Sequence, residues 1–351
     1  MTWFKTNNAV GVDVGTASIK VVELEHGNSG PRLATYGLIE LESNVSNGAA
    51  REVLPVVSRA IMEICKQAQV QSKRAVSSLP GFSVFTSLID LPKMTDKELG
   101  EAIKYEAKRY VPVSLENMVL DWKVVNTREV TTKEGLGSSS MQVLLTAAPK
   151  PLVDRYVNIF QKTDLKLVGL ETEAFALARS LIGNDRTPTL VLDIGSSATD
   201  VIVVTNGLPI LSRTMEVGGK VLTQTIAQSL NVGFARAEQF KRDLGIRQHG
   251  QPLPPAIQTV LHRIVNEIQN ILKLYYAKQS DKITKIVLTG GASQLGGLAQ
   301  YLEEAVKIKT FLGNPWARIS YPQSLAATLQ EIGPNFAVAI GLAMREMMGG
   351  K

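Results

Sequence analysis

The pattern of hydrophobic and polar positions predicts that the chain begins with three consecutive strands and a helix. Short runs of β-branched and other apolar residues are separated by turn residues, which is typical of antiparallel strands. The expected strands are AVGVDVG, SIKVVELE and PRLATYGLIEL. Apolar residues at helical spacing then predict a helix over about residues 49–69. The resulting unit has the order β-β-β-α.

A second, smaller set of elements follows this unit. RAVSSLPG and SVFTSLIDLP have strand patterns, and Thr95 and Glu98 form a Thr-x-x-Glu capping box that predicts a helix ending at Pro112. Two further strands, MVLDWKVVN and MQVLLTAAP, are joined by the polar segment TREVTTKEGLGSSS, which predicts an exposed hairpin tip. Together these elements predict a small α+β subdomain over about residues 84–148.

The three-strand pattern returns in the second half of the chain. A helix from Lys150 to about Thr163, the strand LKLVGLE and the helix TEAFALARSL lead to TLVLDIGSSATDVIVVTNGLPILSRTMEVGG, which again predicts three strands. Helices are expected over about residues 217–230, 233–244 and 255–279. TKIVLTGGASQLGGLAQYLEEAV predicts strand, glycine loop and helix, followed by a short strand near 308–312 and the apolar helix NFAVAIGLAMREMM.

The repeated unit predicts two lobes, one of them with an insertion. At 351 residues the chain is too long for one ordinary core and long enough for two. The expected first lobe has a core subdomain over residues 1–83 and 149–187 and the inserted subdomain over 84–148. The expected second lobe has a core subdomain over residues 188–216 and 283–351 and a helical subdomain over 217–282.

Composition and charge narrow the class of protein. Hydrophobic residues make up 44% of the chain, and no apolar run approaches the roughly 20 residues that cross a bilayer. The net charge is +6, but the basic residues are scattered, so we expect no nucleic-acid partner. The start lacks a secretory signal and the single Cys65 cannot form an internal disulfide, which predicts a cytosolic protein. The three histidines are far apart, so no zinc site is expected.

Two Asp-x-Gly turns carry the candidate chemistry. VDVGTAS in the first unit aligns with LDIGSSA in the second, and Asp193 follows Asp13 by 180 residues. One such turn is ordinary, because an acidic residue and a glycine suit a tight hairpin. Two copies at the start of two similar folding units would face the same cleft, since duplicated lobes face each other. The repeat therefore predicts one binding site between the lobes.

The residue types in these turns predict a polyphosphate site that contains Mg²⁺. Small residues let backbone N–H groups approach phosphate oxygens. Asp13 and Asp193 would repel a polyphosphate unless Mg²⁺, held mainly through water, lies between them and the phosphates. Lys20 lies on the same strand face as Ser18 and would add positive charge. The expected phosphate-site residues are Asp13, Gly15, Thr16, Ala17, Ser18, Lys20, Asp193, Gly195, Ser196, Ser197 and Thr199.

A third glycine-rich segment, LTGGAS, ends a strand and precedes a helix. Its backbone can pass closely over a flat ring at the carboxyl end of that strand, which makes Gly290, Gly291, Ala292 and Ser293 candidate nucleotide contacts. No Gly-Lys-Ser/Thr follows, so the segment is not a Walker-type loop. Simple packing of the helix on the strand explains the glycines equally well.

The order of these motifs resembles the superfamily of actin, heat-shock chaperones and sugar kinases. DVGTASIK and DIGSSATD are similar to its two phosphate motifs, and TGGAS is similar to its adenosine loop. The resemblance implies an α/β actin-like ATPase fold of two ribonuclease H-like lobes, with ATP and Mg²⁺ bound between subdomains.

Two further stretches extend this resemblance to the helical subdomain. EVGGKVLTQTIA resembles the Gly-Gly stretch that begins the fourth subdomain, which adds Gly218 and Gly219 to the expected nucleotide contacts. ARAEQFKRDLG resembles a helix that contacts adenosine, with Glu238 and Lys241 bordering the ribose and base. For the last two residues the alternative is an ordinary amphipathic helix with a solvated glutamate and lysine.

The inserted segment resembles the small subdomain of the cell-division protein FtsA and, more closely, that of the PilM family of type IV pilus assembly. LPKMTDKELGEAIKYEAKRYVPVSLENMVLDWKVV carries this resemblance, which extends overall from about residue 8 to about residue 348. The chain ends at AMREMMGGK without the linker and amphipathic helix of FtsA, so we expect a partner to recruit it to the membrane.

The resemblance to PilM implies a partner and a location. It implies docking of the N-terminal cytoplasmic tail of the bitopic membrane protein PilN, in a groove of the small subdomain and the neighbouring first lobe. The protein would then lie in the cytoplasm on the inner face of the bacterial inner membrane, as part of the pilus inner-membrane complex that serves twitching motility. Self-association stays open. The alternatives are an FtsA-like division filament protein and a small-molecule kinase on the same fold.

Hydrolysis of ATP in this fold needs a group that orients the attacking water. Glu171 and Glu173 in GLETEAFALARSL, which resembles the first connection between the lobes, are the candidates. Both could equally be acids favoured in a first helical turn by the helix dipole. We expect slow hydrolysis at most.

Overall fold

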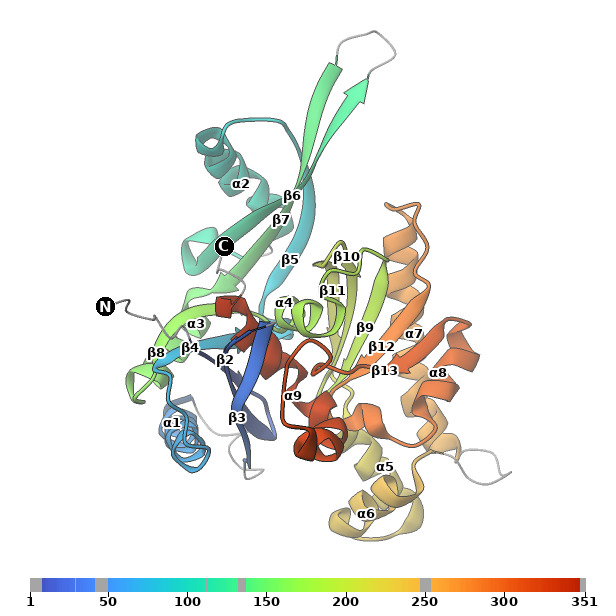
Figure 1. The fold of residues 1–351 in the computed structure, drawn as a ribbon. Helices are drawn as coiled ribbons and strands as arrows, with labels where there is room; N and C mark the ends of the chain where they lie inside the picture. The colour runs from blue at the N-terminus through green and yellow to red at the C-terminus, as the bar shows by residue number, and fades with distance from the viewer. Residues whose placement is uncertain are drawn as a thin grey trace.

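Two five-stranded sheets with the same strand order carry the two lobes (Figure 1). The computed structural model describes residues 8–28, 30–41, 50–111, 113–131, 137–246 and 254–347. Its first sheet has the order β3-β2-β1-β4-β8 and its second the order β11-β10-β9-β12-β13. Each strand of one five-stranded sheet therefore has a counterpart in the other, and the predicted duplication of the lobes is confirmed.

The first sheet has helices on both faces. Its elements are β1 (Ala9–Val14), β2 (Ser18–Gly27), β3 (Gly30–Glu40), α1 (Ala50–Gln67), β4 (Arg74–Leu79), α3 (Lys150–Gln161), β8 (Lys166–Thr172) and α4 (Glu173–Leu177), which continues as the π-helical turn Ala178–Ile182. Alternate residues of β1 and β2, such as Val12 and Ile19, pack against α1 and α3. Val22 and Leu24 of β2 point to the opposite face, because successive side chains of a strand alternate.

The second sheet carries the largest apolar core. Its elements are β9 (Thr189–Ile194), β10 (Thr199–Thr205), β11 (Leu208–Met215), α5 (Gly219–Leu230), α6 (Phe234–Leu244), α7 (Pro255–Tyr276), β12 (Lys285–Thr289), α8 (Leu298–Val306) and β13 (Lys309–Leu312). The apolar stripe of α7, including Leu261, Ile264 and Ile268, is buried against this sheet as its helical spacing predicts.

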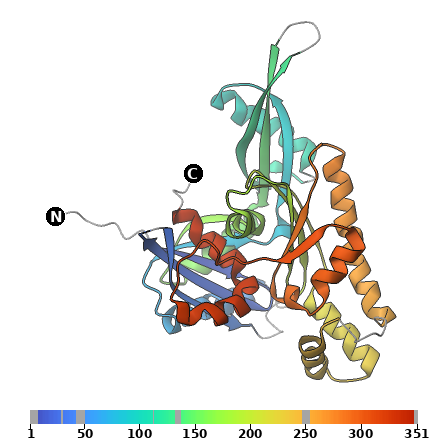
Figure 2. The same ribbon diagram turned by 45° about the vertical axis from the view of Figure 1, so that its right-hand side comes forward.

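The inserted subdomain is a three-stranded sheet covered by one helix. Its elements are β5 (Phe85–Pro92), α2 (Asp96–Tyr110), β6 (Met118–Thr131) and β7 (Gly137–Pro149), in the sheet order β5-β7-β6. The predicted capping box forms at the start of α2, where Thr95 and Glu98 exchange hydrogen bonds. Figures 1 and 2 show this subdomain projecting from the end of the molecule opposite α5 and α6. Pro112 and part of the predicted hairpin tip lie outside the described residues.

The helix α9 (Ala326–Met347) joins the two lobes. Val76 of the first sheet and Val191 of the second belong to one core cluster with α4 and α9. The approach of α9 to its neighbours is close enough to require glycine. A Cβ on Gly341 would stand 2.5 Å from the Ala176 carbonyl carbon of α4, and a Cβ on Gly11 would stand 2.7 Å from a backbone nitrogen of α9. The backbones themselves therefore fix how the lobes meet.

Candidate functional site

The two predicted turns lie next to each other where the lobes meet. Gly15 and Gly195 each donate their N–H across their own turn, at 3.1 and 2.9 Å, so both turns have the same closed shape. Thr16 Oγ1 of the first turn donates to Ser197 Oγ of the second at 3.2 Å, although 181 residues separate them. The structure thus brings together the two motifs that the repeat predicts at one cleft.

Each turn aspartate lies opposite a charged residue on the next strand. Asp13 pairs with Lys20 in the β1–β2 register, and Lys20 Nζ is 3.3 Å from Asp13 Oδ2. Asp193 pairs with Asp200 in the same way between β9 and β10. The position seven residues after the turn aspartate is therefore basic in one lobe and acidic in the other. Asp200 was not predicted, although the final aspartate of DIGSSATD aligns with Lys20 and was visible in the sequence.

Four carboxyl groups, from Asp13, Glu173, Asp193 and Asp200, lie in one cluster. Burial, followed by the negative charges of the other three, raises the pKa of Glu173 well above its usual range. Burial and the charges of Asp200 and Asp13 raise the pKa of Asp193 to about 7, against the opposing effect of Lys20. Ionisation of the whole cluster would therefore place more negative charge here than its surroundings can solvate.

This excess of negative charge fits a bound cation. Mg²⁺ prefers carboxylate oxygens, phosphate oxygens and water, and Asp13 and Asp193 supply the first of these. Among the residues that the structure describes, no three His, Cys, Asp or Glu side chains are placed to hold one ion together. The donor set thus suits an ion that completes its coordination with water and phosphate, and Mg²⁺ at this place stays a prediction.

The two glutamates of the connection between the lobes have different surroundings. Arg179 holds Glu171 through two hydrogen bonds of 2.6 and 2.9 Å and also donates to the Gly341 carbonyl at 2.6 Å. Glu171 therefore belongs to an ion pair that ties β8 to α9. Glu173, the first residue of α4, lies in the carboxyl cluster and accepts a hydrogen bond of 3.4 Å from the Gly81 N–H. Of the two candidates, Glu173 is the one beside the turns.

The predicted Gly-Gly stretch lies against the second turn. The Gly219 N–H donates to the Gly195 carbonyl and the Lys220 N–H donates to the Ser196 carbonyl, both at 2.9 Å. A Cβ on Gly218 would stand 2.5 Å from the Ser196 carbonyl oxygen, so a side chain there would push the turn away. The start of α5 and the second phosphate motif therefore form one unit.

The TGGAS segment adjoins the same unit. Gly290 has a φ of +84°, and a Cβ there would stand 2.5 Å from the Ile194 carbonyl oxygen of β9. Ser293 Oγ donates to the Gly290 carbonyl at 2.7 Å and closes the segment on itself. A Cβ on Gly219 would stand 3.2 Å from Cβ of Ala292, so this segment and the Gly-Gly stretch are neighbours.

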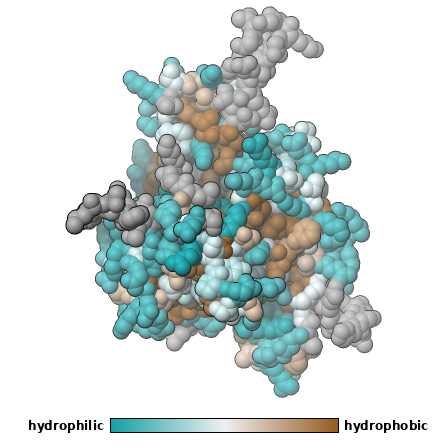
Figure 3. Space-filling view, in the orientation of Figure 1, coloured by the Kyte–Doolittle hydropathy of each residue, from teal (hydrophilic) through white to brown (hydrophobic). Residues whose placement is uncertain are grey.

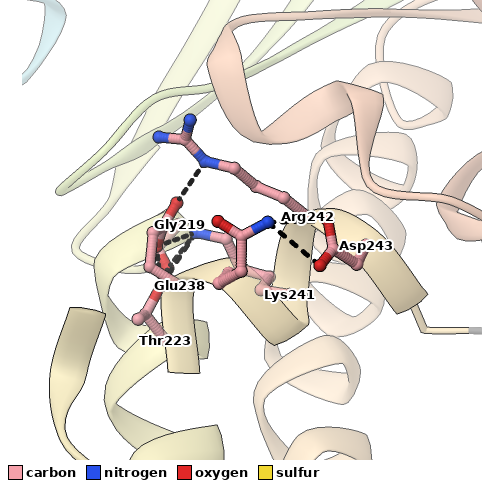
Figure 4. Close-up of polar contacts among 7 residues, drawn as sticks. Gly219, Thr223, Glu238, Lys241, Arg242 and Asp243 are labelled. Carbon is pink, nitrogen blue, oxygen red and sulfur yellow. Dashed lines mark hydrogen bonds and ion pairs between the residues drawn. The ribbon is translucent and has the colours of Figure 1, made fainter. Parts of the chain in front are cut away.

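Glu238 and Lys241 form a hydrogen-bonded group with the start of α5 (Figure 4). Lys241 Nζ donates to the Gly219 carbonyl at 3.2 Å, to Thr223 Oγ1 at 2.8 Å and to Glu238 Oε2 at 2.7 Å. Although burial opposes the change, hydrogen bonds from Lys241 and Thr223 lower the pKa of Glu238. The Lys241 side chain is only 11% exposed, so this is not the solvated pair of an ordinary surface helix.

The remaining predicted phosphate contacts have mixed environments. Ala17 is exposed at the tip of the first turn, and Ser18 is half-buried at the start of β2. Thr199 is buried, and its Oγ1 donates to the Val217 carbonyl. The Thr199 hydroxyl therefore holds β10 to the segment before α5.

A family profile described as type IV pilus assembly protein PilM matches residues 11–347. The chain belongs to the PilM family. A solved structure of a PilM–PilN type IV pilus biogenesis complex is 29% identical to this PilM-family chain, with a TM-score of 0.81, and the alignment covers 97% of this chain and 98% of that one. The family predicted from the inserted segment is thereby confirmed.

More distant relatives share the actin-like fold with the PilM family. FtsA of Enterococcus hirae is 22% identical over 353 residues, which cover 88% of this chain and 79% of that protein. MreB5 of Spiroplasma citri bound to ADP is 14% identical, with a TM-score of 0.51 over 97% of this chain and 96% of that one. The actin-like fold predicted from the three glycine motifs is confirmed.

Proposed function

We propose that this PilM-family chain is an ATP-binding scaffold of type IV pilus assembly that docks the N-terminal cytoplasmic tail of a PilN-type inner-membrane protein. The observation that carries the proposal is the likeness, over nearly the whole chain, to a solved PilM–PilN complex. Nucleotide state would then be passed to the pilus machine through the docked tail. Among the described residues, no helix combines the length and apolar character needed to span a membrane. The docked tail would hold the protein at the inner face of the inner membrane.

The arrangement of the cleft supports ATP as the ligand. MreB5 structures with ADP and with AMPPNP bound share the fold of this chain. The two turns would offer backbone N–H groups and hydroxyls to the phosphates, with Lys20 as the nearby cation. Glu238, Lys241 and the TGGAS segment would border the adenosine. Mg²⁺ held at Asp13 and Asp193 would neutralise the phosphate charge that these carboxylates otherwise repel.

Exposed apolar side chains in and beside the inserted subdomain support it as the docking surface. Phe82, just before β5, is 66% exposed, and Phe85 at the start of β5 is 38% exposed. Trp122 and Val124 of β6 are 37% and 41% exposed. Figure 3 shows hydrophobic side chains gathered over β6 and β7. A surface of this kind on a soluble lobe suits an extended peptide with apolar side chains.

Capture of the tail tests the docking half of the proposal. A synthetic peptide of the PilN N-terminal cytoplasmic tail is expected to bind the full chain in a fluorescence-anisotropy titration. Phe82→Ser should weaken this binding about tenfold, because truncation of an exposed aromatic anchor removes contact area that the peptide would bury. Phe311→Ser on β13, where the phenylalanine is 53% exposed in the other lobe, is the matched control and should bind normally. Absence of binding by the unaltered chain would refute the docking role.

Turnover measurements test the role of Glu173 in hydrolysis. We propose that Glu173 orients the attacking water, since it lies in the carboxyl cluster beside both turns. A cation bound at the cluster would favour the ionised form of Glu173, and an amide cannot accept a proton from water, so Glu173→Gln is expected to lower the steady-state ATP turnover about a hundredfold. Glu171→Gln, two residues away but paired with Arg179, should keep most of the turnover. Equal rates for the two variants would remove Glu173 from this role.

A further inference from the structure

The chain enters the inserted subdomain directly beside the carboxyl cluster. β4 ends at Leu79 and β5 begins at Phe85, and a short 3₁₀ turn, Gly81–Ser83, joins them. We call this turn the root of the inserted subdomain. The Gly81 N–H donates to Glu173 Oε2 at 3.4 Å. At this length the hydrogen bond is weak, but it is a specific contact between the root and Glu173.

Gly81 also lies against the second carboxyl group of the cluster. A Cβ added to Gly81 would stand 2.9 Å from Asp200 Oδ1 and 3.2 Å from Thr214 Oγ1. Thr214 Oγ1 in turn donates to Asp200. The backbone of Gly81 does not have a positive φ, so an alanine would fit the local conformation and meet only these neighbours. Glycine at this position therefore allows the root to touch both carboxyl groups at once.

A small cavity lies between the root and the carboxyl cluster. It has a volume of about 210 Å³ and lies between the root and the beginning of β5 on one side and α4, β10 and β11 on the other. Phe82, Glu173 and Asp200 all line it. The root packs against β11 on one side of this space, and the hydrogen bond from Gly81 to Glu173 joins it to the carboxyl cluster.

We propose that Gly81 is a positioning residue that links the inserted subdomain to Glu173, so that a partner docked on the subdomain changes the orientation of the Glu173 carboxylate. This inference rests on the proposed docking and hydrolysis functions. The link needs only a small displacement, since the hydrogen bond and the contact with Asp200 both lie within one residue of Phe82. A coupling between two binding sites is reciprocal, so a nucleotide that reorients Glu173 would in turn change the affinity of the subdomain for its partner.

Amide hydrogen exchange in the nucleotide-free full chain tests the contact itself. Glu173→Ala removes the acceptor, so the Gly81 amide is expected to exchange about fivefold faster than in the unaltered protein. Glu173→Gln keeps an oxygen at the same position and should restore most of the protection. If Glu173 only stabilised α4, the Gly81 amide would exchange at the same rate in both variants. Equal exchange of the Gly81 amide in all three proteins would overturn the proposal.

A pair of glycine variants tests the coupling. In Gly81→Ala the new methyl group would press on Asp200 and break the link between the root and the cluster. The tail peptide is then expected to change the amide hydrogen exchange of β5 but no longer that of the first turn of α4. ATP turnover should fall about tenfold, with KM for ATP unchanged, because binding groups are untouched. Gly100→Ala is the matched control within the same subdomain, since its Cβ would meet only the Trp122 ring at 3.8 Å.

The outcomes separate this inference from the function on which it rests. If the unaltered chain binds neither ATP nor the tail peptide, the proposed function fails, and the exchange of the Gly81 amide still decides whether the contact with Glu173 exists. If Gly81→Ala and Gly100→Ala transmit peptide binding to α4 equally well, the proposed function stands and the coupling through Gly81 is refuted.

Discussion

Replacing Gly290 with alanine is expected to weaken binding of Mg-ATP at least tenfold. The residue has a φ of +84°, which an alanine adopts only at a cost of about 1 kcal/mol or more. Its new Cβ would also stand 2.5 Å from the Ile194 carbonyl oxygen and crowd the Asp193 carboxylate. The TGGAS segment would have to move away from β9, and the surface that we expect to contact adenosine would move with it. Isothermal titration calorimetry with ATP and Mg²⁺ measures the change.

Gly30→Ala is the matched control for this variant. Gly30 also has a positive φ, of +133°, but a Cβ there would meet nothing within 4 Å, and it is the first residue of β3. It should cost backbone strain without changing ATP affinity. If Gly290→Ala binds Mg-ATP as tightly as Gly30→Ala does, the TGGAS segment has no part in the nucleotide site.

Replacing Gly341 with alanine is expected to destabilise the fold by about 3 kcal/mol, the upper part of the range for overpacked cores. In a solvated helix the same change would stabilise by up to about 1 kcal/mol, since alanine is the better helix former. Here the Cβ would stand 2.5 Å from the Ala176 carbonyl carbon and closer still to its oxygen. Backbone atoms of a packed helix cannot rotate out of the way, so the steric term outweighs propensity.

Differential scanning calorimetry of the full chain measures this destabilisation as a lowered Tm. Gly233→Ala, at the start of α6 where a Cβ would meet nothing within 4 Å, is the control and should leave the Tm nearly unchanged. A Tm for Gly341→Ala equal to or above that of the control would show that α4 and α9 are not in backbone contact. Because Arg179 donates to the Gly341 carbonyl, the variant should also loosen the ion pair with Glu171.

Much of the fold could be predicted because the three-strand pattern with its Asp-x-Gly turn occurs twice in the sequence. The alternation of strand residues and the helical stripes predicted the strands and helices, with α2 starting at Thr95 and α7 buried along one stripe as expected. The recurrence of Asp-x-Gly after 180 residues predicted that two turns would meet. The bond between Thr16 and Ser197 shows that they do.

The candidate site was harder to predict where tertiary neighbours decide the role of a residue. Glu171 and Glu173 are equivalent in the sequence, two residues apart at a strand end. Only the position of Arg179, in the π-helical turn that follows α4, separates the glutamate of an ion pair from the glutamate of the carboxyl cluster. Thr199 is a second example. Its hydroxyl was predicted to contact phosphate, but in the structure it donates a hydrogen bond to the Val217 carbonyl.

The family and the duplicated lobes could be inferred before the fold was known, because the order of the motifs carries the resemblance and the repeated strand pattern predicts the duplication. Only the folded protein shows that Asp200 joins the carboxyl cluster and that Gly81, at the root of the inserted subdomain, reaches Glu173. Gly81 and Glu173 are 92 residues apart, and Asp13 and Asp200 are 187 residues apart. The geometry of these contacts is fixed by how closely α4, α9 and the two sheets pack. A local sequence pattern does not predict which distant residues come into contact, because burial and charge at a site depend on all the elements that meet there.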